Sequence, residues 1–92
     1  MMRASERADE IRRRLDAAFS PIELDVIDES HLHVGHAGAQ SGMGHFRVRI
    51  VAQDFSGLSR IQSHRLIYDA LGTLMQTDIH ALSVNASGDL SQ

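Results

Sequence analysis

The hydrophobic residues of this 92-residue chain change their spacing along the sequence, and that change limits the folds it can adopt. Two segments place hydrophobic residues every three or four positions, which is typical of amphipathic helices; they are residues 3–19 and 59–76. Three segments alternate hydrophobic and polar residues, which is typical of half-buried strands; they are residues 22–29, 45–52 and 79–86. Because each element has one apolar face to bury, the pattern predicts an α/β (α+β) two-layer sandwich, with helices on one face of a three-stranded sheet.

Local signals define the ends and faces of the two helices. We expect Ser5 to cap the first helix and Pro21 to end it, since proline disfavours helical geometry in the residue before it. Residues 53–58 should form a turn that includes one helical turn, and Ser59 should begin the second helix. A seam of that helix should face the core; its members are Ile61, His64, Tyr68, Leu71 and Met75, widened by Ile67 and Leu74.

The first two strands flank a long loop, residues 30–44, that is rich in glycine and histidine. Loops of this length are often functional. The two strands should pair as an antiparallel hairpin. Arg47 and Arg49 fall on the polar face of the second strand, where Glu23 and Asp25 of the first can pair with them across the sheet.

The composition excludes several classes of protein. There is no cysteine, so the chain has no disulfide or thiol nucleophile and cannot hold an iron–sulfur cluster by thiolates alone. A net charge of −3 and only 4% aromatic residues argue against a general nucleic-acid binder. No apolar run has the length of a membrane span and no signal-peptide pattern is present, so we expect a cytoplasmic protein without a membrane partner. We expect one domain over residues 1–92, with an ordered core of about 5–86 and a polar tail at 87–92.

Histidine is the unusual residue of this composition. Four of the six histidines lie between His31 and His45, and His33 and His36 belong to the same glycine-rich loop. Closely spaced imidazoles on such a loop can converge on one transition-metal ion. Their spacing is not a standard zinc signature, and a solvated polar loop explains the same residues.

The two remaining histidines lie in predicted regular structure. His80 begins the third strand on the face that also carries Leu82, where a histidine is commonly half-buried and hydrogen-bonded. His64 lies in the apolar seam of the second helix, where we interpret it as a structural residue. The pattern alone therefore favours structural roles for both.

A phosphate site is one interpretation of the residues where the second helix begins. Gly57 and Arg60 precede and open this helix, and Arg65 follows one turn later. Free backbone amides and arginine at a helix N-terminus bind phosphate. Ser59 capping its own helix explains the same residues without a ligand.

Five motifs of the sequence, taken in order, strongly resemble the BolA family, in its branch with histidine rather than cysteine in the first loop. The motifs are Asp28-Glu29-Ser30-His31-Leu32-His33, Gly42 with His45-Phe46-Arg47-Val48, Phe55-Ser56-Gly57-Leu58-Ser59-Arg60, His64-Arg65-Leu66-Ile67-Tyr68 and Ile79-His80-Ala81-Leu82. Each motif is weak alone, but their order and spacing together are specific and cover about residues 5–86.

The resemblance implies a fold and a role. BolA-like proteins have the element order α-β-β-α-α-β, similar to the class II K-homology domain. They are not enzymes, which agrees with the lack of common catalytic motifs in this sequence and leaves no small-molecule substrate. They pair with monothiol glutaredoxins and share a [2Fe-2S] cluster that is also bound by the glutaredoxin cysteine and glutathione. By this resemblance His80 is one ligand and His33 the other, with His31 and His36 as alternates.

Two other functions remain open. Some BolA proteins are described as transcriptional regulators, so DNA binding through Gly57, Arg60 and Arg65 is the alternative, although the sequence Gly57-Leu58-Ser59-Arg60 departs from the GxxG loop of K-homology domains. The third is a plain interaction module that binds its partner without a metal.

Overall fold

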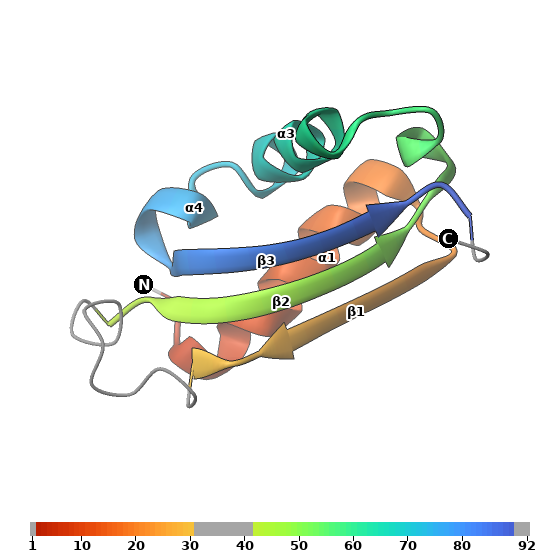
Figure 1. The fold of residues 1–92 in the computed structure, drawn as a ribbon. Helices are drawn as coiled ribbons and strands as arrows, with labels where there is room; N and C mark the ends of the chain where they lie inside the picture. Colours follow the sequence, from red (N-terminus) through yellow and green to blue (C-terminus); the bar gives the residue numbers. More distant parts are fainter. Residues whose placement is uncertain (1, 31–41, 90–92) are drawn as a thin grey trace.

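Three strands form one sheet, and the helices pack on one of its faces (Figure 1). The computed structural model describes residues 2–30 and 42–89. The strands are β1 (Glu23–Asp28), β2 (Gly44–Val51) and β3 (Ile79–Ser87). They lie in the order β1-β2-β3, with β1 antiparallel and β3 parallel to β2.

The helical elements form the second layer of the predicted sandwich. They are η1 (Ala4–Glu6), α1 (Arg7–Phe19), η3 (Gln53–Phe55), α3 (Arg60–Leu71) and α4 (Leu74–Thr77). With η3 and α3 in the two helical places after β2, the chain has the order α-β-β-α-α-β that the resemblance implies. The predicted fold class is confirmed, and α4 is a short addition to it.

α1 follows the sequence pattern at its end but not at its start. Ile11 and Leu15 are buried, and the helix stops at Ser20, which adopts the left-handed conformation (φ 46°) before Pro21. The prediction that Ser5 caps this helix is wrong. Ser5 lies inside the 3-10 turn η1, in which the Glu6 amide donates to the Arg3 carbonyl, so α1 begins only at Arg7.

The β1–β2 hairpin has the predicted antiparallel pairing and charge pattern. Arg49 bonds to Glu23 at 2.6 Å and lies 3.7 Å from Asp25, as predicted. Arg47 instead pairs with Glu29 at 3.1 Å. Ile22, predicted to be on the buried face, precedes β1 and is 60% exposed.

The second long helix is broken, contrary to the prediction that it continues to residue 76. α3 ends at Gly72, whose backbone angles (φ 56°, ψ −127°) are readily adopted only by glycine. The chain then turns into α4, and the Asp78 amide closes α4 by donating to the Leu74 carbonyl. This turn directs the chain into β3.

α3 is also rotated relative to the predicted seam. Its buried residues are Ser63, Ile67 and Leu71. Ile61 is 65% exposed and Tyr68 is 39% exposed, so neither belongs to the core. The helix carries hydrophobic side chains on two flanks, and only one flank meets α1 and the sheet.

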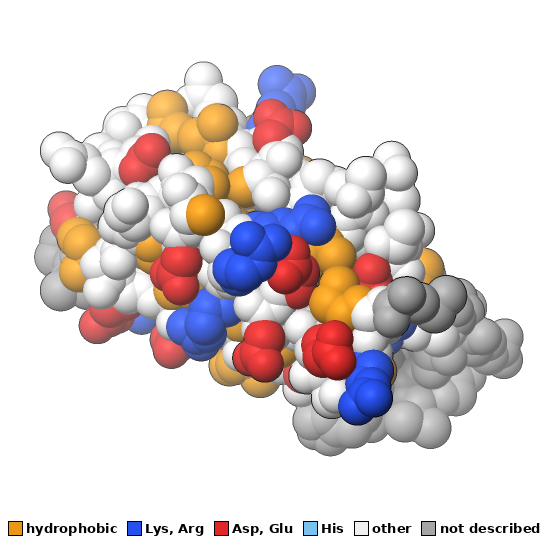
Figure 2. Space-filling model, turned by 180° about the vertical axis from the view of Figure 1, so that it is seen from behind, with side chains coloured by type: hydrophobic (Ala, Val, Ile, Leu, Met, Phe, Trp, Pro, Cys, Tyr) orange, Lys and Arg blue, Asp and Glu red, His pale blue; other side chains and the backbone are white. Residues whose placement is uncertain are grey.

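The core lies between the sheet and the helices and is mainly aliphatic, in a chain with only 4% aromatic residues. Its buried members come from α1, β2, the residue after β2, η3, α3, α4 and β3, and they are Ile11, Leu15, Phe46, Val48, Ile50, Ala52, Phe55, Ile67, Leu71, Leu74 and Ile79. Figure 2 shows the molecule from behind, where charged side chains of both signs are interspersed over the surface.

Within the described ranges, no helix has the length and hydrophobicity to cross a bilayer. β3 reaches Ser87, one residue into the predicted tail, whose last three residues lie outside the described ranges.

Candidate functional site

His80 occupies a β-bulge at the start of β3. Gly44 of β2 pairs with Ile79, whereas the next residue, His45, pairs with Ala81, so His80 is the extra residue. A bulge re-aims the side chain that it carries. Ile79 is buried and His80 is exposed, so the prediction that His80 shares the half-buried face of Leu82 is wrong. The bulge instead presents the imidazole at the surface.

A second histidine lies beside the bulge. The ring of His45 is 5.2 Å from the ring of His80, centroid to centroid, and inclined to it by 46°. His45 itself is only 9% exposed. Its backbone is fixed on both sides: the His45 amide donates to Ser30 Oγ at 3.1 Å, and the Glu29 amide donates to the His45 carbonyl at 2.8 Å. His80 is therefore an exposed imidazole packed against a rigid, buried one.

An ion pair anchors the chain immediately before the bulge. Arg7 Nε of α1 donates to Asp78 Oδ1 at 2.9 Å, and both side chains are almost buried. The Thr77 hydroxyl donates to Asp78 Oδ2, and the Gly44 amide donates to the Asp78 carbonyl. Hydrogen bonds from Thr77 and then from Arg7 hold the pKa of Asp78 below its usual value, against the opposing effect of burial. These contacts tie α1, β2 and the start of β3 together next to His80.

The predicted loop ligands fall in a segment that the structure does not describe. His33, His31 and His36 lie outside the described residues. Among the residues that are described, no group of three or more His, Cys, Asp or Glu side chains is arranged to hold a metal ion. The described part of the chain thus offers the His80 imidazole, with His45 beside it, as a partial ligand set.

The predicted phosphate site lies far from His80. Gly57 (φ 76°) forms the turn before α3, and it lines a surface hollow together with Ser87 of β3. His80 and Ser87 are seven residues apart along β3, which is roughly 23 Å at the rise of a strand. The two predicted sites are therefore separate.

The start of α3 is capped as predicted. Ser59 and Gln62 form a reciprocal capping box, in which Ser59 Oγ accepts from the Gln62 amide and Gln62 Oε1 accepts from the Ser59 amide. Arg60 and Arg65 are exposed, and neither forms an ion pair within the described ranges. Arg60 lines the hollow beside the turn, whereas Arg65 lies outside it. Two exposed cations thus lie in the first two turns of α3, and of the two Arg60 lines the hollow.

His64 has a different place from the one predicted. It is only partly buried, its ring is 6.3 Å from that of Tyr68, and it lines the hollow one turn after Arg60. Sequence reasoning missed this because Ile61 and Tyr68 share its flank and suggested a buried seam. The alternative spacing of Ser63, Ile67 and Leu71 was the signal that would have placed His64 at the edge of the core.

Known proteins resemble this chain in both sequence and fold. A family model described as BolA-like protein matches residues 15–89. The DNA-binding transcriptional regulator BolA of Escherichia coli is 39% identical over 77 residues, covering 84% of this chain and 70% of that protein. SufE-like protein 1 of Arabidopsis thaliana, chloroplastic/mitochondrial, is 41% identical over 85 residues, covering 87% of this chain.

The solved structure of the BolA domain of SufE1 from Arabidopsis thaliana superposes with a TM-score of 0.81 and 38% identity, covering 94% of this chain and 95% of that one. This chain spans only 23% of the whole SufE-like protein 1 and 51% of the Arabidopsis protein BOLA1. BOLA1 and the Escherichia coli regulator are named as BolA proteins, and neither name denotes a catalytic activity. The family model, the sequence identities and the shared fold together establish that this chain is a member of the BolA-like protein family.

Proposed function

We propose that this chain is a non-enzymatic partner of a monothiol glutaredoxin and supplies imidazole ligands to a shared [2Fe-2S] cluster, for iron–sulfur cluster trafficking or iron sensing. The observation that carries the proposal is the exposed imidazole of His80, presented by a β-bulge and packed against the buried ring of His45. The reducing cytoplasm is the proposed compartment, which fits a chain without cysteine.

The donor set of this chain fits half of such a site. A chain without cysteine offers no thiolate ligand, so thiolates must come from the glutaredoxin and from glutathione. Imidazole in place of thiolate leaves a cluster less negative and raises its reduction potential, as in Rieske centres. His80 is the ligand on the rigid sheet, and His33 is the proposed ligand from the loop, with His31 and His36 as alternates. The hydrogen bonds around Ser30 and Asp78 hold the backbone next to His80 in place.

Replacing His80 by alanine is expected to abolish cluster sharing. The wild-type chain is mixed with a monothiol glutaredoxin homodimer that carries a [2Fe-2S] cluster and glutathione, and visible circular dichroism and EPR of the reduced cluster are recorded. We expect a changed spectrum with Rieske-like character, which is lost in His80→Ala and retained in Arg60→Ala, because Arg60 lies towards the other end of β3.

An unchanged spectrum with no complex would remove the cluster function. A changed spectrum that survives in His80→Ala would disprove the ligand assignment. Binding of the glutaredoxin without iron and glutathione would favour the plain interaction module.

DNA binding is the second candidate, favoured by the exposed Arg60, which opens α3 after the Gly57 turn, and by the exposed Arg65 in the second turn of α3. The name of the Escherichia coli relative is consistent with it. We expect affinity for DNA to fall steeply with added salt, because phosphate contacts release counterions. Arg60→Ala and Arg65→Ala should each reduce the slope of log K against log salt by about 0.7–0.9. Fluorescence anisotropy over a salt series measures this slope, and an affinity indifferent to salt and to both substitutions would exclude this site.

A further inference from the structure

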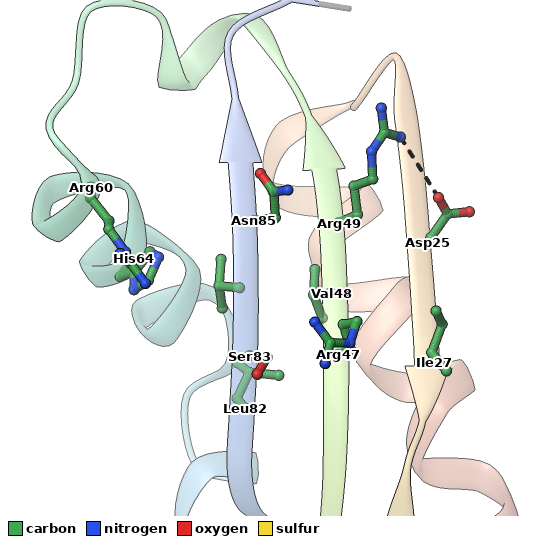
Figure 3. A pocket seen from close by; sticks show the side chains of 11 residues that line it. Asp25, Ile27, Arg47, Val48, Arg49, Arg60, His64, Leu82, Ser83 and Asn85 are labelled. Atoms are coloured by element: carbon green, nitrogen blue, oxygen red, sulfur yellow. Dashed lines mark ion pairs between the residues drawn. The ribbon is translucent and has the colours of Figure 1, made fainter. Parts of the chain in front are cut away.

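A continuous trench runs along β3 beside α3. Two surface hollows, of about 460 and 750 Å³, share Arg60, His64, Val84 and Asn85 among their lining residues. Figure 3 shows Arg60 and His64 directed from α3 towards β3, with Ser83 and Asn85 on the strand opposite them. The trench therefore has one wall from α3 and a floor from the sheet.

Among the described residues, the arginine of this trench that has no carboxylate partner lies on the α3 wall. On the sheet side, Glu29 lies 3.1 Å from Arg47, and Glu23 lies 2.6 Å from Arg49. Arg60, on the opposite wall, has no carboxylate partner in the described part of the chain. A positive charge without a carboxylate partner among the described residues is therefore exposed on α3, although the whole chain has a net charge of −3.

His64 can add a second charge to this wall. It follows Arg60 by four residues, so both side chains lie on the same flank of α3. No ion pair joins His64 to a carboxylate among residues 2–30 and 42–89. The charged groups that line the first hollow with His64 are Arg60 of α3, Arg47 and Arg49 of β2, and Asp25 of β1, and β3 contributes the neutral Ser83 and Asn85. The Tyr68 ring contacts that of His64 from the next turn of α3. Imidazole gains its charge between about pH 8 and pH 5.

These groups match the chemistry of a nucleic-acid backbone. Arginine, serine and asparagine are among the side chains that contact phosphate and sugar in protein–DNA complexes, and all three occur around this trench as Arg60, Ser83 and Asn85. A protonated imidazole next to Arg60 would provide a second phosphate contact. Of the described carboxylates, only that of Asp25 lines either of the two hollows, and it is 3.7 Å from Arg49.

We propose that the trench between α3 and β3 binds the phosphodiester backbone of DNA through Arg60 and His64, and that protonation of His64 strengthens this binding. The inference rests on DNA binding, the second of the two proposed functions, and adds a residue and a pH response to it. Because the trench and His80 lie at different places along β3, the response does not involve the cluster ligand.

The test measures DNA affinity of the full chain by fluorescence anisotropy at pH 6, 7 and 8 and constant ionic strength. The probe is one labelled oligonucleotide, used both as a single strand and as its duplex. Comparing the two affinities shows whether the trench binds single-stranded or double-stranded DNA. We expect binding at pH 6 to be tighter than at pH 8 by up to about fivefold, the upper end of what one exposed ion pair contributes. His64→Gln should remove this pH response, and Arg60→Ala should weaken binding at every pH. His80→Gln is the matched control, because it removes another exposed histidine and should keep the response.

The outcomes separate this inference from the function on which it rests. Binding that is independent of pH, or a pH response that survives in His64→Gln or disappears in His80→Gln, overturns the role of His64 and leaves DNA binding standing. No binding of either form of DNA at any pH overturns both. Circular dichroism of each variant confirms that it is folded, and the His64→Asn variant repeats the test with a smaller neutral side chain.

Discussion

Replacing Asp78 by alanine is expected to lower the free energy of unfolding by about 3 kcal/mol, a large fraction of the stability of a small domain. The substitution leaves the Arg7 guanidinium without its partner at a site where the two side chains are 12% and 11% exposed. Removing one member of a nearly buried ion pair is costly because the remaining charge stays desolvated. Urea unfolding followed by far-UV circular dichroism measures the change.

Asp25 provides the matched control for this prediction. It is also an aspartate near an arginine, at 3.7 Å from Arg49, but its side chain is 62% exposed. Exposed pairs of this kind contribute little, so Asp25→Ala should change stability by less than about 0.5 kcal/mol. Similar losses in Asp25→Ala and Asp78→Ala would show that burial of the Arg7–Asp78 pair does not determine its contribution.

The Arg7–Asp78 pair also predicts an acid sensitivity. The pKa of Asp78 is lowered in the folded protein from its usual value of 3.8, so the unfolded chain binds a proton more readily. Its stabilising contribution is therefore complete above about pH 5 and is lost as the pH falls through the folded pKa. Asp78→Asn removes this titration. The stability difference between wild type and Asp78→Asn should narrow from pH 5 downwards, and a constant difference would contradict the role of the charge.

The elements of this fold that depend on neighbours in sequence could be predicted from the sequence. Alternation in residues 45–52 correctly separates buried Phe46, Val48 and Ile50 from Arg47 and Arg49, since successive side chains of a strand point to opposite faces. The capping box at Ser59 was likewise readable from local residue types. These local signals were sufficient to predict the two-layer sandwich and the β1–β2 hairpin.

The features that depend on distant parts of the chain could not be read in this way. The bulge at His80 exists only in the pairing of β3 with β2, so alternation within β3 placed this side chain on the wrong face. His45 became a neighbour of His80 through the same pairing. The loop ligand His33 stays a prediction, because the resemblance alone supports it. Thus the family motifs selected His80, and the geometry supplied the reason for its exposure.

The rotation of α3 shows the same limit, because hydrophobic residues occupy two flanks of this helix. Ile61 and Tyr68 repeat at helical spacing as well as Ile67 and Leu71 do. Which flank is buried depends on where α1 and the sheet lie, and neither is encoded in the periodicity of residues 60–71. The structure buries Ile67 completely and leaves Ile61 65% exposed.

A pair of substitutions distinguishes these two orientations of α3. Ile67→Ala removes a side chain that is 0% exposed and is expected to lower the free energy of unfolding by about 3–4 kcal/mol, through lost burial and the cavity left behind. Ile61→Ala makes the same chemical change on the exposed flank and should cost less than about 0.5 kcal/mol, since alanine also has the higher helix propensity. Chemical denaturation measures both changes, with one slope m of unfolding free energy against denaturant concentration applied to the wild type and both variants. The opposite order would place Ile61 in the core, turn His64 inward with it, and remove the α3 wall on which the pH response of DNA binding depends.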